Sequence, residues 1–308
     1  QKTSYRYSTR MLFFVRCDGR RVRGLHALNA MMPYLMRGRN ESAVYYNKEI
    51  NLENALAFIR LRKNSHPELA EELTLFGLIL AAALRTVALL PRLNRFIHRR
   101  AFYDRNHIAF AFIVKQKFEV DAPEVNAKVF LDPHDDLDTV CRKTQECIRN
   151  ARAHGEGDGE RFVSIFHHIP GGKALLMGVY RLLDTLNLAP WSLLRMDPMY
   201  STAYFANLGS LGLDAPFHHL YEWGTCGMFI VLGKLHAKEV RHGPNPIRQR
   251  YMDFRVSIDE RIADGFYFAK AAAVFNRLIS DPALLTISLE EVRRELGLEL
   301  ELAPSTRE

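Results

Sequence analysis

A long apolar segment constrains the fold of this chain more than any other feature. We predict a helix over Glu68–Leu90 that ends before Pro91, because a proline ring cannot continue a helix. Apolar residues fall on most of its faces, so other layers of the protein must cover it. Arg85 interrupts the run, which leaves too few consecutive apolar residues for a membrane-spanning helix. The sequence therefore predicts a buried helix, with membrane contact not expected.

The remaining segments mix strands and helices without strict alternation. This order favours an α+β fold, a two-layer sandwich in which helices cover a mixed sheet, over a doubly wound nucleotide-binding fold. Runs of apolar, β-branched and aromatic residues predict strands at 43–50, 107–114, 125–131, 202–207, 228–240 and 250–258. Helical patterns cover 136–153, 160–187 with a break at 170–172, and 265–279.

Composition narrows the class of protein. The chain has 308 residues, of which 48% are hydrophobic and 25% charged, as in a globular protein with a sizeable core. Four cysteines without a C-x-x-C pair are too few for a disulfide scaffold, so we expect a cytoplasmic protein. The net charge of +7 indicates an anionic partner, for which nucleic acid, a membrane surface and a phosphorylated cofactor are the alternatives.

The distribution of charged residues and of prolines suggests the domain organisation. We predict a solvated basic arm over residues 1–25, containing a short apolar run at 11–15 that could form an edge strand. A single domain over 26–303 and a loose tail over 304–308 follow.

Glycine-rich segments do not match phosphate-binding motifs. The run at 171–173 lacks the G-x-x-x-x-G-K-[ST] pattern of a phosphate loop. The run at 207–212 lacks the G-x-G-x-x-G pattern of a dinucleotide fold, so it predicts a tight turn.

Two histidine pairs, at 167/168 and at 218/219, raise the question of a metal site. Neighbouring residues do not point the same way, and no H-E-x-x-H spacing accompanies them, so we expect no metal. A single histidine of either pair, such as His219, could line a pocket. Basic residues are scattered and no nucleic-acid motif is present, so nucleic acid is not an expected partner.

The most informative segment lies at residues 257–266, where a predicted strand ends and a helix begins. It reads Asp259-Glu260-Arg261-Ile262-Ala263-Asp264-Gly265. It resembles the H-x-x-x-D-G corner, often D-H-R-V-x-D-G, of the chloramphenicol acetyltransferase-like superfamily. The similarity is greatest to the catalytic domain of the 2-oxo acid dehydrogenase E2 acyltransferases. Arg261, Asp264 and Gly265 match this motif, whereas Glu260 stands in place of the catalytic histidine.

Other segments resemble the same family in the same order. They are the S-N-L-G-x-x-G-like run at 207–212, the apolar strand at 225–234, the opening helix at 32–42 and the stretch at 91–96. The resemblance covers most of the chain. Against the minimal E2 core, a helical insertion near 160–195 is extra, and the lipoyl and peripheral-subunit-binding domains of full E2 chains have no counterpart.

The resemblance implies a mechanism and an assembly. In the family, the histidine removes a proton from the thiol of CoA or dihydrolipoamide, or from a hydroxyl, and the nucleophile attacks a thioester. The active sites lie between the subunits of a homotrimer, and trimers assemble into larger cages. The motif aspartate pairs with an arginine, so we expect Asp264 to pair with Arg39, with Arg37 as the alternative. Arg261 and His219 are expected to have structural roles at the site.

The matched site departs from the family at two positions. Besides Glu260, Ala206 stands where the family has a hydroxyl that stabilises the oxyanion, and Tyr204, Ser201 or Thr202 would have to replace it. A carboxyl group has an ordinary pKa of about 4.3 and is a weaker base than imidazole.

Two hypotheses follow. In the first, the protein is a CoA-dependent acyltransferase with a divergent active site whose catalytic residues are Glu260, Asp264, Asn207 and Tyr204. In the second, it is an inactive E2-like homologue that acts as an oligomeric scaffold or binding protein. The insertion, with apolar residues such as Leu182 and Trp191, either packs on the same core, covers the pocket, or docks on a partner or a membrane.

Overall fold

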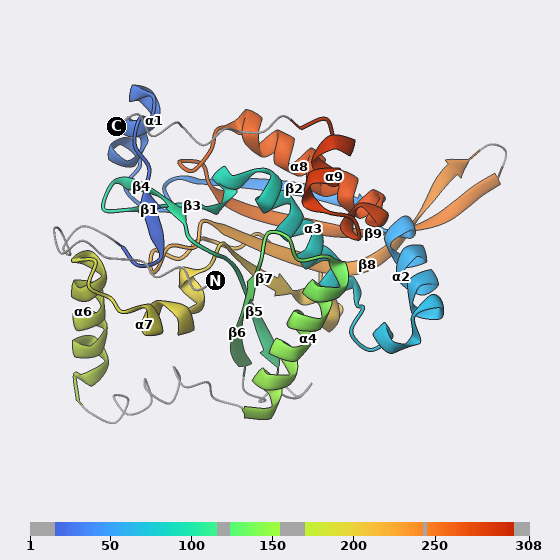
Figure 1. Ribbon diagram of the computed structural model, residues 1–308, viewed down its shortest axis with the longest axis horizontal. Coiled ribbons are helices and arrows are strands. Elements are labelled where there is room, and N and C mark those ends of the chain that lie inside the picture. The colour runs from blue at the N-terminus through green and yellow to red at the C-terminus, as the bar shows by residue number, and fades with distance from the viewer. Residues whose placement is uncertain (1–15, 116–123, 155–169, 243–244, 299–308) are drawn as a thin grey trace, which may run out of the picture.

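A mixed sheet covered by helices forms the centre of the molecule (Figure 1). The computed structural model describes residues 16–115, 124–154, 170–242 and 245–298, so the predicted strand at 11–15 lies outside the described residues. In spatial order the strands are β2 (Ala43–Asn51), β9 (Asn245–Asp259), β8 (Met228–His242), β7 (Ala203–Asn207), β5 (Ile108–Lys115) and β6 (Glu124–Leu131). Strand β7 runs parallel to both neighbours, and the other pairs are antiparallel. The predicted α+β architecture is confirmed.

The predicted buried helix is α3 (Leu75–Leu89), which contacts α4 (Leu137–His154) and α8 (Gly265–Ser280). Nearly all of its residues are buried, including Arg85, which donates to the carbonyl of Ile287. Burial lowers the pKa of Arg85. The helix begins at Leu75 and not at Glu68 as predicted.

The late start of α3 has a local cause. The side chain of Thr74 accepts a hydrogen bond from the amide of Gly77, which is the geometry of an N-cap. Upstream, Pro67–Leu69 forms a separate short 3-10 helix, η1. The capping threonine therefore divides one apolar-rich run into two elements.

A second, three-stranded sheet was not predicted from the sequence. Its antiparallel order is β1 (Gly19–Arg21), β4 (Ala101–Arg105) and β3 (Arg95–His98). A two-residue turn, Arg99-Arg100, joins β3 to β4, and φ is positive at both residues, 49° and 63°. Such turns favour Asn-Gly, so two arginines give no hairpin signal in the sequence.

Further helices flank the sheet or extend from it. They are α1 (Ala27–Leu35), α2 (Glu53–Ser65), α6 (Gly172–Thr185), α7 (Trp191–Met196) and α9 (Leu289–Glu295). Short 3-10 helices complete the chain at η2 (Pro91–Asn94), η3 (Pro198–Tyr200), η4 (Leu208–Leu211) and η5 (Pro282–Leu285). No helix among the described residues is long and apolar enough to cross a membrane.

Helices α6 and α7 form the described part of the predicted insertion, of which residues 160–169 lie outside the described residues. Figure 1 shows them beside one edge of the molecule. Tyr180 and Leu183 pack in a small cluster with Tyr200 and Trp223, separate from the main core, whereas Trp191 of α7 packs on Phe130 of the large sheet. The opposite face of α6 leaves Leu182 57% exposed.

Candidate functional site

The corner between β9 and α8 is held by a buried ion pair. The guanidinium of Arg261 donates from Nε to Oδ1 of Asp259 at 2.8 Å and from Nη2 to Oδ2 at 2.7 Å. The hydroxyl of Ser42 donates to the same carboxylate at 2.9 Å. Arg261 also donates to the carbonyls of Met36 and Arg37. These contacts tie the corner to the segment that follows α1.

Glu260 lies between the two ion-paired residues. Its amide donates to the carbonyl of Ser42 at 3.0 Å, and its side chain is half-buried. Among the described residues, no side chain or amide forms a hydrogen bond or ion pair with its carboxylate. The structure therefore presents Glu260 on a rigid backbone with its carboxylate available to a ligand.

Asp264 has a different role from the one expected. It is exposed and is the N-cap of α8, where its carboxylate accepts a hydrogen bond from the amide of Tyr267 at 2.9 Å. The predicted ion pair of Asp264 with Arg39 or Arg37 is wrong. Arg39 is buried and donates to the carbonyls of three residues, Tyr221, Glu222 and Gly224. The buried aspartate of this corner is Asp259, which lies before Glu260, and not the motif residue after it.

Asn207 lies part of the way along the sheet from Glu260, level with Phe254 of β9. In the register of the sheet, Asn207 is opposite Leu232, and Leu232 is opposite Phe254. Glu260 follows Phe254 by a stretch of chain that spans about 20 Å when extended. One chain therefore does not bring Glu260 and Asn207 to the same reacting atom.

Tyr204 is buried on the sheet face that lies away from α3. Its hydroxyl donates to Oδ1 of Asn126 at 2.6 Å, and its ring stacks on Phe229 at a centroid distance of 4.9 Å. Ala206, two residues further along β7, carries no hydroxyl. The structure thus places neither group as a free donor beside Glu260.

The two histidines at 218 and 219 lie over the same face. The ring of His218 stacks on the ring of Phe229 at a centroid distance of 3.9 Å. The hydroxyl of Ser257 donates to the carbonyl of His218. His219 is half-buried and its Nδ1 is 3.0 Å from the carbonyl of Leu220. These contacts give both rings packing roles, and the described residues contain no cluster with metal-ligand geometry. The pair at 167/168 lies outside the described residues.

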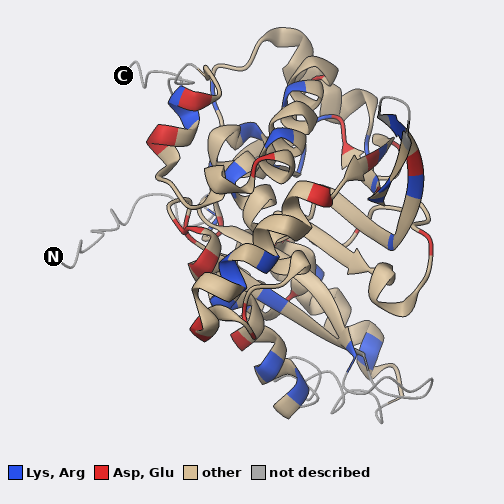
Figure 2. Cartoon of the chain, turned by 90° about the vertical axis from the view of Figure 1, so that its right-hand side faces the viewer, with Lys and Arg blue, Asp and Glu red and all other residues tan. Residues whose placement is uncertain are grey.

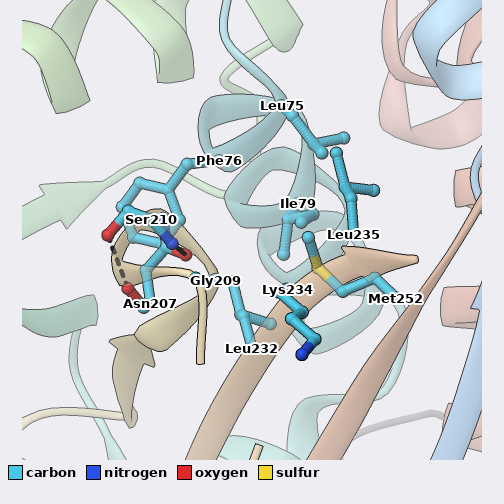
Figure 3. Close-up of a pocket in the computed structure, with 11 residues that line it drawn as sticks. Leu75, Phe76, Ile79, Asn207, Gly209, Ser210, Leu232, Lys234, Leu235 and Met252 are labelled. Carbon is cyan, nitrogen blue, oxygen red and sulfur yellow. Dashed lines mark hydrogen bonds between the residues drawn. The ribbon is translucent and has the colours of Figure 1, made fainter. Parts of the chain in front are cut away.

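A pocket of about 470 Å³ lies between α3, η4 and β8 (Figure 3). A bulge in β8 between Leu232 and Leu235 contributes to its wall. In Figure 3, Asn207 and Ser210 lie on one side, and apolar side chains face one another on the other side. The apolar wall consists of Leu75, Phe76, Ile79, Leu232, Leu235 and Met252.

Polar groups of the pocket come from the end of β7, from η4 and from β8. The side-chain oxygen of Asn207 accepts a hydrogen bond from the amide of Ser210 at 3.3 Å. Nζ of Lys234 lies 3.4 Å from Oδ1 of Asp214. The sequence identified Asn207 but not Lys234 or the apolar wall. The wall comes from the first turn of α3, and its position depends on the N-cap at Thr74. Chemically, the pocket suits an apolar group with a polar end, and none of the described residues that line it is a carboxylate that could act as a base.

Comparisons with known proteins place this architecture. No protein-family model and no curated protein sequence matches the chain. Among solved structures, it is similar to a dihydrolipoamide acetyltransferase of Azotobacter vinelandii, studied for the roles of a serine, a histidine and an asparagine in catalysis. The identity is 16% and the TM-score 0.58, over 85% of this chain and 89% of that chain.

Two further structures show the same similarity. The cubic core of the pyruvate dehydrogenase multienzyme complex is 15% identical with a TM-score of 0.57, over 85% of this chain and 89% of that chain. A truncated catalytic core of the 2-oxoacid dehydrogenase complex of Thermoplasma acidophilum is 14% identical with a TM-score of 0.51, over 85% of this chain and 99% of that chain. The chain has the fold of the E2 acyltransferase catalytic cores, as the resemblance predicted.

Proposed function

We propose that this protein is a CoA-dependent acyltransferase of the E2-core fold, with Glu260 in the position of the catalytic base. The observation that carries the proposal is the corner itself. The buried pair Asp259–Arg261 and the hydroxyl of Ser42 fix the backbone around Glu260, yet leave its carboxylate without a partner among the described residues. A carboxylate that is held in place by its backbone, and whose oxygens have no partner among the described residues, is suited to act on a ligand.

The separation of Glu260 from the pocket supports a homotrimer. About 20 Å of strand lies between Glu260 and the level of Asn207, so one chain holds the two halves of the site apart. In a trimer, Glu260 of one subunit would face the pocket of the next, as the resemblance to E2 cores implies. Association of trimers into a larger cage is an extension of the same proposal.

The proposed reaction is transfer of an acyl group between thiols. The carboxylate of Glu260 takes the proton of the acceptor thiol, the thiolate attacks the thioester carbonyl, and the proton passes to the departing thiolate of CoA. The 470 Å³ pocket falls in the size range of small-ligand sites, and its apolar wall suits an acyl chain or the stem of a thioester substrate. A carboxylate is a weak base for the proton of a thiol, so we expect slow turnover.

The test is acyl transfer from acyl-CoA to a panel of thiol, amine and hydroxyl acceptors. We expect Glu260→Gln to lower the rate by about a hundredfold, the effect of losing a general base. Glu239→Gln is the matched control, because Glu239 is an exposed residue of β8 far from the corner and should leave the rate unchanged. A rate at background level that Glu260→Gln does not alter would contradict the proposal.

A second candidate function is a non-catalytic trimeric scaffold or binding protein. The observation that favours it is the absence of an oxyanion donor at two matched positions, since Ala206 has no hydroxyl and the hydroxyl of Tyr204 is bonded to Asn126. Binding of acyl-CoA without turnover, in a protein that is trimeric by mass photometry, would favour this candidate. A monomer at micromolar concentration would contradict both.

A further inference from the structure

A second cavity, of about 260 Å³, is lined by arginines from separate parts of the chain. We call it the arginine pocket. Its walls come from the segment after α1, the turn between β3 and β4, the last turn of α6, and the corner after β9. The arginines that line it are Arg37, Arg39, Arg99, Arg100, Arg181 and Arg261.

The two carboxylates of the arginine pocket, Asp184 and Glu222, are too few to neutralise its six arginines. Asp184 accepts from Nη1 of Arg16 at 2.8 Å. Glu222 accepts from the backbone amides of Arg39 and Asn40, at 3.1 and 2.9 Å. The pocket therefore keeps an excess of positive charge, which favours an anion.

Four of the six guanidinium groups are available to a ligand. Arg39 and Arg261 are buried and already bonded, Arg39 to backbone carbonyls and Arg261 to Asp259, but the other four residues are exposed. Arg99 donates from one nitrogen to the carbonyl of Thr185, and Arg100 lies over the ring of Tyr34 at 5.2 Å. Each of these contacts leaves other N–H groups free to bind an anion. Arg37 and Arg181 form no side-chain hydrogen bond or ion pair with any described residue.

Two local features indicate that the pocket is built for a ligand. The turn residues Arg99 and Arg100 both adopt left-handed backbone conformations, which Asn-Gly would adopt more easily. Strained backbone of this kind collects at ligand sites, because the surrounding structure keeps it for the side chains it presents. In addition, the buried Nε2 of His98, which lines the pocket, has no hydrogen-bond partner among the described residues.

We propose that the arginine pocket binds an oxyanion of the phosphate class, a phosphomonoester or diphosphate group. Arginine matches phosphate oxygens with paired N–H donors, and guanidinium groups from three segments suit a group that carries several oxygens and two or more charges. A monocarboxylate offers too few oxygens to engage them all. The proposal does not depend on Glu260, since neither binding nor its test requires acyl transfer.

The test is isothermal titration calorimetry with inorganic pyrophosphate at low salt. The variant Arg37→Ala/Arg181→Ala should lose about a hundredfold in affinity, because each of the two lost charge-assisted contacts carries roughly a factor of ten. Arg152→Ala/Arg248→Ala is the matched control: it removes the same charge from two exposed arginines outside the pocket and should bind as the wild type does. Absence of pyrophosphate binding, or equal loss in both double variants, overturns the proposal.

A second variant separates ligand binding from folding. Arg99→Asn/Arg100→Gly gives the turn its preferred residues, so we expect a higher melting temperature together with weaker pyrophosphate binding. A variant that is stabilised but binds pyrophosphate normally would contradict a role of the turn arginines in binding and overturn the site as proposed.

Competition identifies the source of the phosphate group. If CoA displaces pyrophosphate and pantetheine does not, the phosphates of CoA occupy the arginine pocket. If neither displaces it, the ligand is a separate phosphorylated compound. Either result supports a phosphate site, whereas displacement of pyrophosphate by pantetheine, which carries no phosphate, contradicts it.

Discussion

Asp259 and Arg261 form a two-point ion pair whose side chains are only 2% and 3% exposed. The pair encloses Glu260 in sequence and closes the corner between β9 and α8. The amide of Arg261 also donates to Asp259, so the carboxylate orders the backbone on both sides of Glu260. The position of the proposed base therefore depends on a neighbouring carboxylate that does not itself reach the ligand.

Asp259→Asn should destabilise the protein strongly. The amide keeps the shape of the carboxylate but leaves the guanidinium of Arg261 buried without a counter-charge, which costs about 3–5 kcal/mol in the free energy of unfolding. Denaturant unfolding of the wild type and of Asp259→Asn measures this difference in the free energy of unfolding. Asp281→Asn is the control, because its pair with Arg277 is exposed and should change stability by less than about 0.5 kcal/mol. Equal effects in the two variants would show that the buried pair is not special.

The larger sheet could be predicted from the sequence because its strands are long and rich in apolar and aromatic residues. Strand β5, for example, reads IAFAFIVK and is buried along most of its length. The smaller sheet could not, because β1 and β3 are short and the turn at Arg99-Arg100 lacks the glycine that marks a hairpin. The sequence pattern thus predicts the long, buried strands of the larger sheet. It does not predict the short strands joined by a turn of unusual residues.

Gly77→Ala should destabilise α3, although alanine is normally the better helix former. The added methyl carbon would lie 2.6 Å from Sγ of Cys141 on α4, closer than packed atoms approach. Thermal unfolding should show a lower melting temperature for Gly77→Ala. Because Cys141→Ala removes that sulfur, the double variant should lose less stability than the two single losses added together. Additive losses would mean that the contact with Cys141 is not the cause.

The candidate site was predictable only in part. The corner at Glu260 was found because its residues match a motif, but the arginine that holds the corner pairs with Asp259 and not with Asp264. Nothing in the sequence distinguishes the two aspartates, since their roles depend on which one the fold buries. The pocket walls were missed for a similar reason. They join the first turn of α3 to strands far along the chain.

Lys128 should make stability depend on pH. Its ammonium group donates to three carbonyls, those of Leu194, Asp197 and Tyr200, each at 2.9 Å. Burial, followed by the charge of Arg105, lowers the pKa of Lys128 from 10.5 to about 7. Between these two values the unfolded chain holds the proton and the folded chain does not. The free energy of unfolding should therefore gain a few kcal/mol from this residue as pH rises from about 7 to 10.5.

The measurement is denaturant unfolding across that range for the wild type and Lys128→Met. The variant lacks the titrating group, so its stability should rise less with pH than that of the wild type. Lys270→Met, which removes an exposed lysine, should keep the wild-type profile. Parallel profiles for all three proteins would contradict the role of Lys128. Figure 2 shows why a single-site comparison is needed: basic and acidic residues are spread over many elements, so the total pH dependence includes other groups that titrate.

Gly209→Ala should damage the 470 Å³ pocket and not only the fold. A methyl carbon at Gly209 would lie 2.3 Å from the carbonyl oxygen of Gly233, a backbone atom that cannot turn away. Relief requires η4 to move off β8, which displaces Asn207 and Ser210 from the pocket wall. We therefore expect a loss of about 1–3 kcal/mol in the free energy of unfolding and weaker acyl-CoA binding in the fraction that remains folded.

Gly178→Ala is the matched control for this substitution. Gly178 lies within α6, and an added methyl carbon there meets no atom within 4 Å. Replacing glycine by alanine inside a helix should then stabilise the protein by up to about 1 kcal/mol and leave acyl-CoA binding unchanged. Calorimetric titration with acyl-CoA, at a temperature where both variants are folded, separates the two effects. If Gly209→Ala lowers the stability but binds acyl-CoA like Gly178→Ala, the wall formed by η4 does not contact the ligand, and the apolar face of α3 must position it alone.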